Sequence, residues 1–286
     1  MFNKFNLIVK YVFYILTSSF IFVACNTSGQ KKEADNIPII SDTIVQVTPD
    51  EGESDEEYAA FYEKYFKNFS YDSIKLFQNT TYSDLEDSRK WFHIMDTILG
   101  LFKTGNSYSL KKCWIEKVNV FENPCGGYDL IEPTLNTKEN PLFLFRGLKH
   151  YNHSPVIDTI PAGLKLWTGQ RKDFVFNDVS YQLRAEGIVL HKGNEGTEMY
   201  YEDIKDYKLY LTSGDKTQCI VEMKKFNNTM TELLWIGDLD GDGKPDFIVS
   251  SPDWYEDYRM LLLLSSYAEG DGLVKLVSIT VDSFAC

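Results

Sequence analysis

The stretch LLWIGDLDGDGKPDFIVSSP, residues 233–252, places a turn rich in aspartate and glycine between two apolar segments. The apolar segments, residues 232–238 and 246–250, contain the aliphatic and aromatic side chains that favour extended strands. The glycines and the proline between them favour a tight change of direction. We therefore expect two antiparallel strands joined by a loop at residues 238–246, within a β architecture.

The loop carries a spacing of oxygen ligands that is typical of a calcium site. Aspartates occupy its first, third, fifth and ninth positions, and a backbone carbonyl falls at the seventh. Gly243 supplies the backbone freedom that the turn needs. Four carboxylates this close together repel one another unless a cation lies among them, and Ca²⁺ prefers such sites. The predicted ligands are the side chains of Asp238, Asp240, Asp242 and Asp246 and the carbonyl of Lys244.

The loop differs from an EF-hand, because its twelfth position is Val249 instead of glutamate and Pro245 opposes a following helix. Its position between two strands resembles the FG-GAP type of calcium-binding repeat, which implies the same aspartate ligands and the same Lys244 carbonyl. The motif occurs once, and about 175 residues of β pattern are too few for a seven-bladed propeller. We therefore expect a structural Ca²⁺ ion that fixes a hairpin, with a dissociation constant on the order of 10⁻⁴–10⁻³ M.

The same texture of short apolar stretches and turns extends over residues 108–286, which we expect to form a β-rich domain. Turn signals such as Asn177-Asp178 and Gly270-Asp271-Gly272 separate the stretches. The expected strands cover residues 113–121, 141–145, 164–167, 174–176, 181–190, 207–211, 218–223, 232–238, 246–250, 259–265 and 273–281. Their spacing predicts a mainly antiparallel sandwich, barrel or partial blade-like sheet.

Residues 57–107 show a helical pattern instead. Aromatic side chains from Tyr58 to Phe66 recur at helical spacing, with acidic residues before them and lysines after them. A second apolar-periodic stretch covers residues 85–102. These patterns predict a short helical N-terminal part, which makes the expected fold class α+β.

The first 24 residues have the pattern of a signal peptide. Lys4 and Lys10 precede an uncharged apolar run that ends at Val23-Ala24-Cys25. This ending resembles the lipobox of bacterial lipoproteins, which implies removal of residues 1–24, lipidation of Cys25 and a membrane anchor. Residues 25–56 then form a flexible acidic tether. We expect an outer-membrane lipoprotein of the cell envelope, facing either the periplasm or the exterior. The alternative is an uncleaved signal anchor with Cys25 as an ordinary thiol.

The four cysteines after Cys25 suggest structural disulfides in an oxidising compartment. Of the three possible pairings, we favour Cys113 with Cys125, which closes a hairpin-like segment, and Cys219 with Cys286, which fastens the end of the chain. A zinc site is the alternative, but the sequence has no C-x-x-C spacing.

The formal charge of −13 disfavours a nucleic-acid partner, because phosphate backbones repel an acidic chain. The sequence has no nucleophile elbow, P-loop or Rossmann fingerprint, so we expect a module that binds a glycan or a protein. The alternatives are an envelope hydrolase acting on glycan or peptidoglycan, and an envelope inhibitor or immunity-type protein. Trp254, Tyr255 and Tyr258 are candidate contact residues, although the sequence favours the alternative that these aromatics close one end of the β domain. The H-x-x-H pair His150 and His153 is assigned to a loop instead of a metal site.

Overall fold

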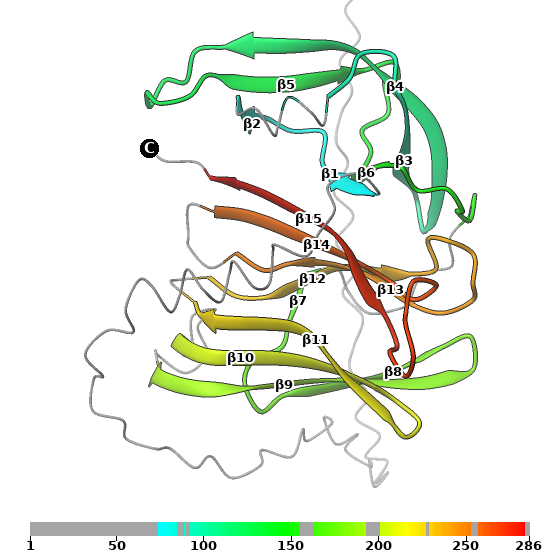
Figure 1. Cartoon of the computed structure of the whole chain (residues 1–286), viewed down its shortest axis with the longest axis vertical. Helices are drawn as coiled ribbons and strands as arrows, with labels where there is room; N and C mark the ends of the chain where they lie inside the picture. Colours follow the sequence, from blue (N-terminus) through cyan, green and yellow to red (C-terminus); the bar gives the residue numbers. More distant parts are fainter. Residues whose placement is uncertain are drawn as a thin grey trace, which may run out of the picture. The chain divides into compact units, whose positions relative to one another are not determined.

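The computed structural model describes residues 74–84, 89, 92–154, 163–192, 201–226, 229–252 and 257–283. All of them lie in one compact unit, and they form three antiparallel sheets of six, four and five strands (Figure 1). In this part of the chain no helix has the length and apolar character that crossing a membrane would require.

The expected α+β fold class is wrong, because the elements of the described residues are all strands. Within residues 57–107 the chain forms β1 (Lys75–Phe77), β2 (Tyr82–Ser83) and β3 (Thr97–Thr104). The helix expected at residues 85–102 ends inside β3, whose five central residues are all buried. A strand that is covered on both faces carries an unbroken apolar run. Over so short a length, this run resembles the apolar stripe of a helix. The other expected helix, at residues 56–69, lies outside the described residues.

The six-stranded sheet has the order β1-β6-β3-β4-β5-β2. Its longest strand, β4 (Ser107–Phe121), pairs through its first half with β3 and through its second half with β5 (Leu130–Leu135). The strand β6 (Phe143–Arg146) pairs with both β1 and β3. The second half of β4 and β5 extend away from the rest of the sheet as a ribbon (Figure 1).

The four-stranded sheet is a meander with the order β11-β10-β9-β8. It contains β8 (Arg171–Phe176), β9 (Val179–Lys192), β10 (Tyr201–Ser213) and β11 (Lys216–Lys225). Along β9 the residues Tyr181, Leu183 and Ala185 are buried and alternate with more exposed ones, so one face of this sheet covers a core. Asn177 and Asp178 both have positive φ and form the two-residue turn between β8 and β9 that their sequence predicts.

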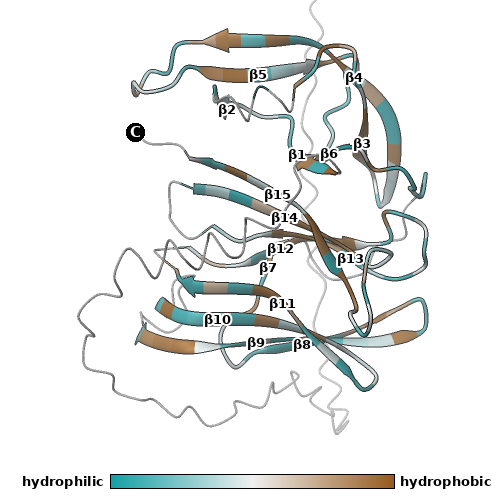
Figure 2. Cartoon of the chain, viewed as in Figure 1, coloured by the Kyte–Doolittle hydropathy of each residue, from teal (hydrophilic) through white to brown (hydrophobic). Residues whose placement is uncertain are grey.

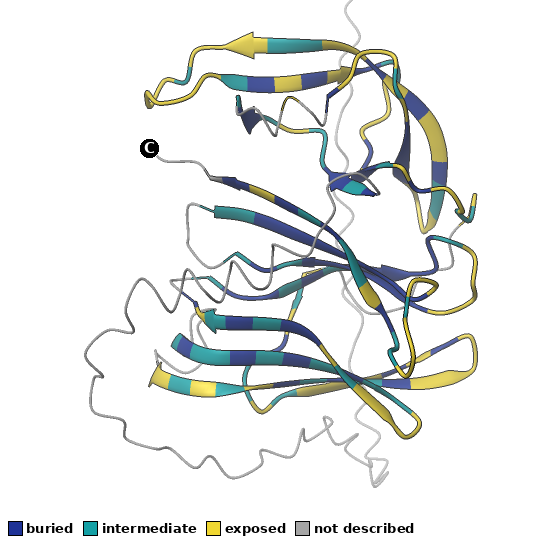
Figure 3. Cartoon of the chain, in the orientation of Figure 1, coloured by how far each residue is buried: buried dark blue, intermediate teal, exposed yellow. Residues whose placement is uncertain are grey.

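The five-stranded sheet has the order β15-β14-β13-β12-β7 and lies between two hydrophobic cores. Its strands are β7 (Leu164–Lys165), β12 (Glu232–Gly237), β13 (Asp246–Ser250), β14 (Asp257–Leu264) and β15 (Lys275–Ser283). On β13, Phe247 and Val249 pack into the core shared with the four-stranded sheet, whereas Ile248 packs into the core shared with the six-stranded sheet. Figures 2 and 3 show the hydrophobic, buried centre that results.

The expected disulfides Cys113–Cys125 and Cys219–Cys286 are wrong, because Cys113 and Cys219 are free thiols. Cys113 faces a core from the middle of β4 and is 1% exposed. From Cys113 to Phe121 the extended strand rises by about 26 Å, whereas bridged Cα atoms lie about 4.4–6.8 Å apart. Cys125, beyond the end of β4, is disulfide-bonded.

Candidate metal centre

The aspartate-rich loop closes the hairpin of β12 and β13, as its flanking apolar segments predict. The last cross-strand pair before the loop is Gly237 with Asp246, so Asp246 is both the ninth loop residue and the first of β13. Gly241 and Gly243 have φ values of 85° and 83°, which other residues adopt only with strain. The two glycines therefore allow the chain to fold back on the side chain of Asp238.

Three of the four predicted aspartate side chains converge. Asp238, Asp240 and Asp246 each place a carboxylate oxygen so that the three atoms lie within 4.8 Å of one another. Asp238 and Asp246 are buried, and Asp240 is half-buried. Asp242 is exposed, and its Oδ1 accepts hydrogen bonds from the Lys244 N–H at 2.8 Å and the Ser265 hydroxyl at 2.9 Å. The Lys244 carbonyl stays a predicted ligand.

Backbone hydrogen bonds fix the orientation of the converging carboxylates. Asp238 accepts the Gly241 N–H at 2.7 Å on one oxygen and the Gly243 N–H at 3.2 Å on the other. Asp246 Oδ2 accepts the Leu239 N–H at 2.8 Å, across the base of the loop. The loop thus holds its acceptor groups in place through its own backbone, which reduces the ordering that binding a cation would require.

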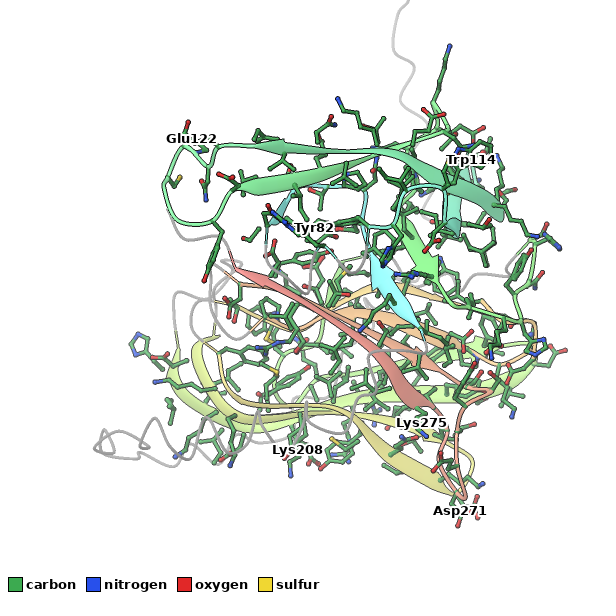
Figure 4. The ribbon with its side chains drawn as sticks, turned by 45° about the horizontal axis from the view of Figure 1, so that its top comes forward. Tyr82, Trp114, Glu122, Lys208, Asp271 and Lys275 are labelled. Carbon is green, nitrogen blue, oxygen red and sulfur yellow. The ribbon has the colours of Figure 1, made fainter. Side chains whose placement is uncertain are left out.

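Two serines that sequence reasoning did not identify complete the centre. The Ser265 N–H donates to Asp246 Oδ1 at 2.8 Å, and the Ser265 hydroxyl is shared between Asp246 Oδ1 at 3.0 Å and Asp242 Oδ1. The Ser266 hydroxyl donates to Asp240. Both serines begin the connection between β14 and β15, whose tip carries Asp271 and which leads to Lys275 (Figure 4). The sequence carries no local signal for them, because only the pairing of β13 with β14 brings them to the loop.

Neighbouring connections hold the loop from two other sides. The Asn152 N–H donates to the Leu239 carbonyl at 2.8 Å, from the segment that follows β6. The Asn177 side-chain amide donates to the Gly243 carbonyl at 2.8 Å, from the turn between β8 and β9. The loop is therefore bonded to segments that border all three sheets.

The electrostatics of the cluster fit a divalent cation. Burial raises the pKa of Asp246 well above its usual range, and the carboxylate of Asp240 raises it further. Burial also raises the pKa of Asp240, although the Ser266 hydroxyl acts in the opposite direction. Among the described residues, no lysine or arginine forms an ion pair with Asp238, Asp240 or Asp246. Hard oxygen ligands in excess, without a cationic side chain, are a donor set that suits Ca²⁺.

The other candidate residues do not form a site with this loop. Trp254 and Tyr255 lie outside the described residues, whereas Tyr258 is half-buried and its hydroxyl donates to Gln78 Oε1 at 2.6 Å. Tyr258 therefore packs at a core and is not part of an exposed aromatic platform. His150 and His153 are both exposed, and neither belongs to a group of metal-ligating side chains among the described residues.

Comparison with known proteins gives one family match. The FG-GAP repeat model matches residues 236–274, a segment that contains the aspartate loop, β13, β14 and both serines. No curated protein and no solved structure matches the chain. The FG-GAP repeat indicates a β-rich binding or interaction module of the extracellular kind.

Proposed function

We propose that this chain is a cell-envelope lipoprotein, anchored at Cys25, whose β-rich module binds one Ca²⁺ ion and presents a surface to a glycan or protein ligand. The observation that carries the proposal is the convergence of Asp238, Asp240 and Asp246 in a glycine-shaped loop. The FG-GAP match over the same residues supports it. The lipobox-like Val23-Ala24-Cys25 and the acidic composition of residues 25–56 support the proposed location.

The ion would be held by the carboxylates of Asp238, Asp240 and Asp246, with Asp242 and the Lys244 carbonyl as further ligands from the same loop. Its contribution is structural, because it neutralises the crowded carboxylates at the hairpin that joins two strands of the central sheet. An affinity on the order of 10⁻⁴–10⁻³ M suits extracellular calcium, which would keep the module loaded outside the cell.

Thermal unfolding in a chelator and in CaCl₂ tests the proposal. At ten times the dissociation constant the ion should stabilise the fold by about 1.4 kcal/mol, which corresponds to a melting temperature about 3–6 °C higher. The variant Asp240→Asn should lose this rise, because it removes one converging charge while keeping an acceptor for the loop.

The matched control is Asp271→Asn, because the Asp271 side chain is 99% exposed and lies outside the aspartate loop. This variant should keep the full calcium-dependent rise. An equal rise in Asp240→Asn and the unsubstituted protein would overturn the assignment of the site.

A further inference from the structure

A pocket of about 480 Å³ opens at one end of the four-stranded sheet, beside the aspartate loop but separate from it. Its lining comes from β8 at residues 173–175, from β9 at residues 180–182, and from residues 212–214 at the end of β10. We propose that this pocket binds a neutral, hydroxyl-rich ligand, a sugar unit of a glycan. The volume lies within the range of about 300–1,000 Å³ that small-molecule sites occupy.

The polar groups of the pocket suit a ligand that both donates and accepts hydrogen bonds. Gln182 Nε2 donates to Asp173 Oδ1 at 2.7 Å, which sets a carboxylate and a carboxamide side by side. The second oxygen of Asp173 accepts no hydrogen bond from the described residues, so it can accept one from a sugar hydroxyl. The Ser180 hydroxyl adds a donor and an acceptor to the same space, whereas the Ser213 hydroxyl donates to the Ser180 carbonyl and the Thr212 hydroxyl is bonded to Thr217.

The charge of the lining selects against anionic ligands. Asp173 is the one carboxylic acid in the lining, and no lysine, arginine or histidine is among the lining residues. A phosphate or carboxylate ligand would therefore meet a carboxylate without a compensating cation. A neutral sugar keeps its hydrogen bonds to Asp173 and Gln182 without that repulsion.

One exposed apolar side chain, Val175, offers a contact for the C–H face of a sugar ring. The rings of Phe174 and Tyr181, whose centroids lie 5.3 Å apart, pack into the core on the opposite face of the sheet from Asp173 and Gln182, so they hold β8 and β9 together and do not contact the ligand. Val175 is 62% exposed at the rim, next to the polar pair. An apolar side chain thus borders the polar pair, as C–H groups border hydroxyl groups on a pyranose ring.

The proposal rests on the proposed function, for which it names the ligand class and the binding surface, and it does not require the ion for its chemistry. Asn177, which donates to the Gly243 carbonyl, lies in the turn that joins the two strands of the pocket wall. Tyr181 lies close enough to Asp242 for that carboxylate to raise its pKa, in addition to the larger effect of burial. The loop therefore supports the pocket wall from behind, while the ligand contacts come from β8, β9 and β10.

Saturation-transfer NMR with the methyl glycosides of glucose, galactose, mannose and N-acetylglucosamine tests this site, with CaCl₂ present. We expect saturation transfer to at least one glycoside, and amide shift changes that include residues 173–175, 180–182 and 212–214. Asp173→Ala and Gln182→Ala should each weaken that binding about tenfold, the usual effect of losing one strong hydrogen bond. Asp271→Asn, which changes an exposed acid outside the pocket, should leave it unchanged.

Two results would overturn the proposal: no transfer to any of the four glycosides, or equal transfer in the unsubstituted protein, Asp173→Ala and Gln182→Ala. Calcium titration calorimetry on the same samples separates this proposal from the calcium site. Calcium binding without glycoside binding would overturn the proposed sugar site alone. Glycoside binding without calcium binding would overturn the proposed calcium site alone. Unchanged melting temperatures of the two variants show that they are folded.

Discussion

Asp246 is the residue of the loop whose charge is hardest to accommodate. It is 0% exposed, it faces the carboxylate of Asp240, and burial raises its pKa. Three hydrogen bonds from Ser265 and Leu239 offset part of the cost of desolvation. In the metal-free protein the carboxyl group therefore holds a proton more tightly when the chain is folded than when it is unfolded.

This difference in pKa predicts how pH changes the effect of calcium on stability. As pH rises from the unfolded aspartate pKa of about 3.9 through the raised folded value, the metal-free protein loses stability. Ca²⁺ replaces the proton, so the difference in melting temperature between calcium and chelator should grow across that range. Melting curves at a series of pH values measure it. A difference that does not change with pH would contradict the assigned role of Asp246.

The free thiols predict a different kind of pH dependence. Burial raises the pKa of both Cys113 and Cys219 to about 11, although Cys219 is an exposed residue of β11 and Cys113 is 1% exposed. Native protein should react with iodoacetamide at Cys219 but not at Cys113, with a rate that rises about tenfold per pH unit near neutrality. Peptide mass mapping measures both sites. Labelling of Cys113 in the native, folded protein would contradict its position in the core.

Sequence alone identified the loop residues but not the groups that orient them. The regular spacing of Asp238, Asp240 and Asp246 is a local signal, and the structure brings these three side chains together. Ser265 and Ser266 are invisible to such reasoning, because their contacts depend on which strands pair. Asp242 is not one of the three converging residues, and its carboxylate accepts hydrogen bonds from the Ser265 hydroxyl and the Lys244 N–H.

At the scale of elements, the β14–β15 connection acts as a second side of the calcium centre. Ser265→Ala and Ser266→Ala each remove a hydroxyl that orients an aspartate, so each should weaken calcium binding about tenfold. Titration calorimetry measures the affinity, and Ser266→Thr, which keeps a hydroxyl, should restore most of it.

The control for these serine variants is Ser107→Ala, at the exposed start of β4, which should bind calcium normally. Melting temperatures in chelator separate an effect on the ion from an effect on folding. Normal calcium affinity in both serine variants would show that the loop orients its carboxylates without the β14–β15 connection.

The strands were predictable wherever one local pattern covered a whole element. The structure confirms strands over the expected segments 232–238, 246–250, 259–265 and 273–281, in β12, β13, β14 and β15. The pattern failed at β3, where burial on both faces removes the period-two alternation. It also gave no signal for β1 and β2, which are three and two residues long and owe their pairing to distant strands.

At the scale of the whole molecule, the loop connects the four-stranded sheet to the central sheet. Asn177, in the turn that follows β8, donates a hydrogen bond to the Gly243 carbonyl of the aspartate loop. At the opposite edge of that sheet, Gln218 of β11 bonds Leu273 and Val274 of the β14–β15 connection. Both edges of the four-stranded sheet are thus bonded to the segment that the FG-GAP model matches.

Hydrogen exchange can measure this connection. Removing calcium should speed amide exchange at residues 177–178 and 265–274, because the loop supports both, while the β3–β4 turn at residues 105–106 should exchange at an unchanged rate. Mass spectrometry of the protein with and without chelator gives the comparison. A uniform increase over all three segments would show a global loss of stability instead of a local one.

The first and last described strands lie side by side, and this has a consequence for how the chain reaches its fold. The Leu76 N–H donates to Ser278 Oγ at 3.0 Å, and the Ser83 N–H donates to the carboxylate of Asp282 at 3.1 Å. These contacts join residues about 200 positions apart, and closing so large a loop early is entropically costly. During synthesis the N-terminal strands are made first, so β1 and β2 stay uncovered until β15 has been made. Folding should be slow, and a chain that stops short of β15 should leave the six-stranded sheet open to aggregation.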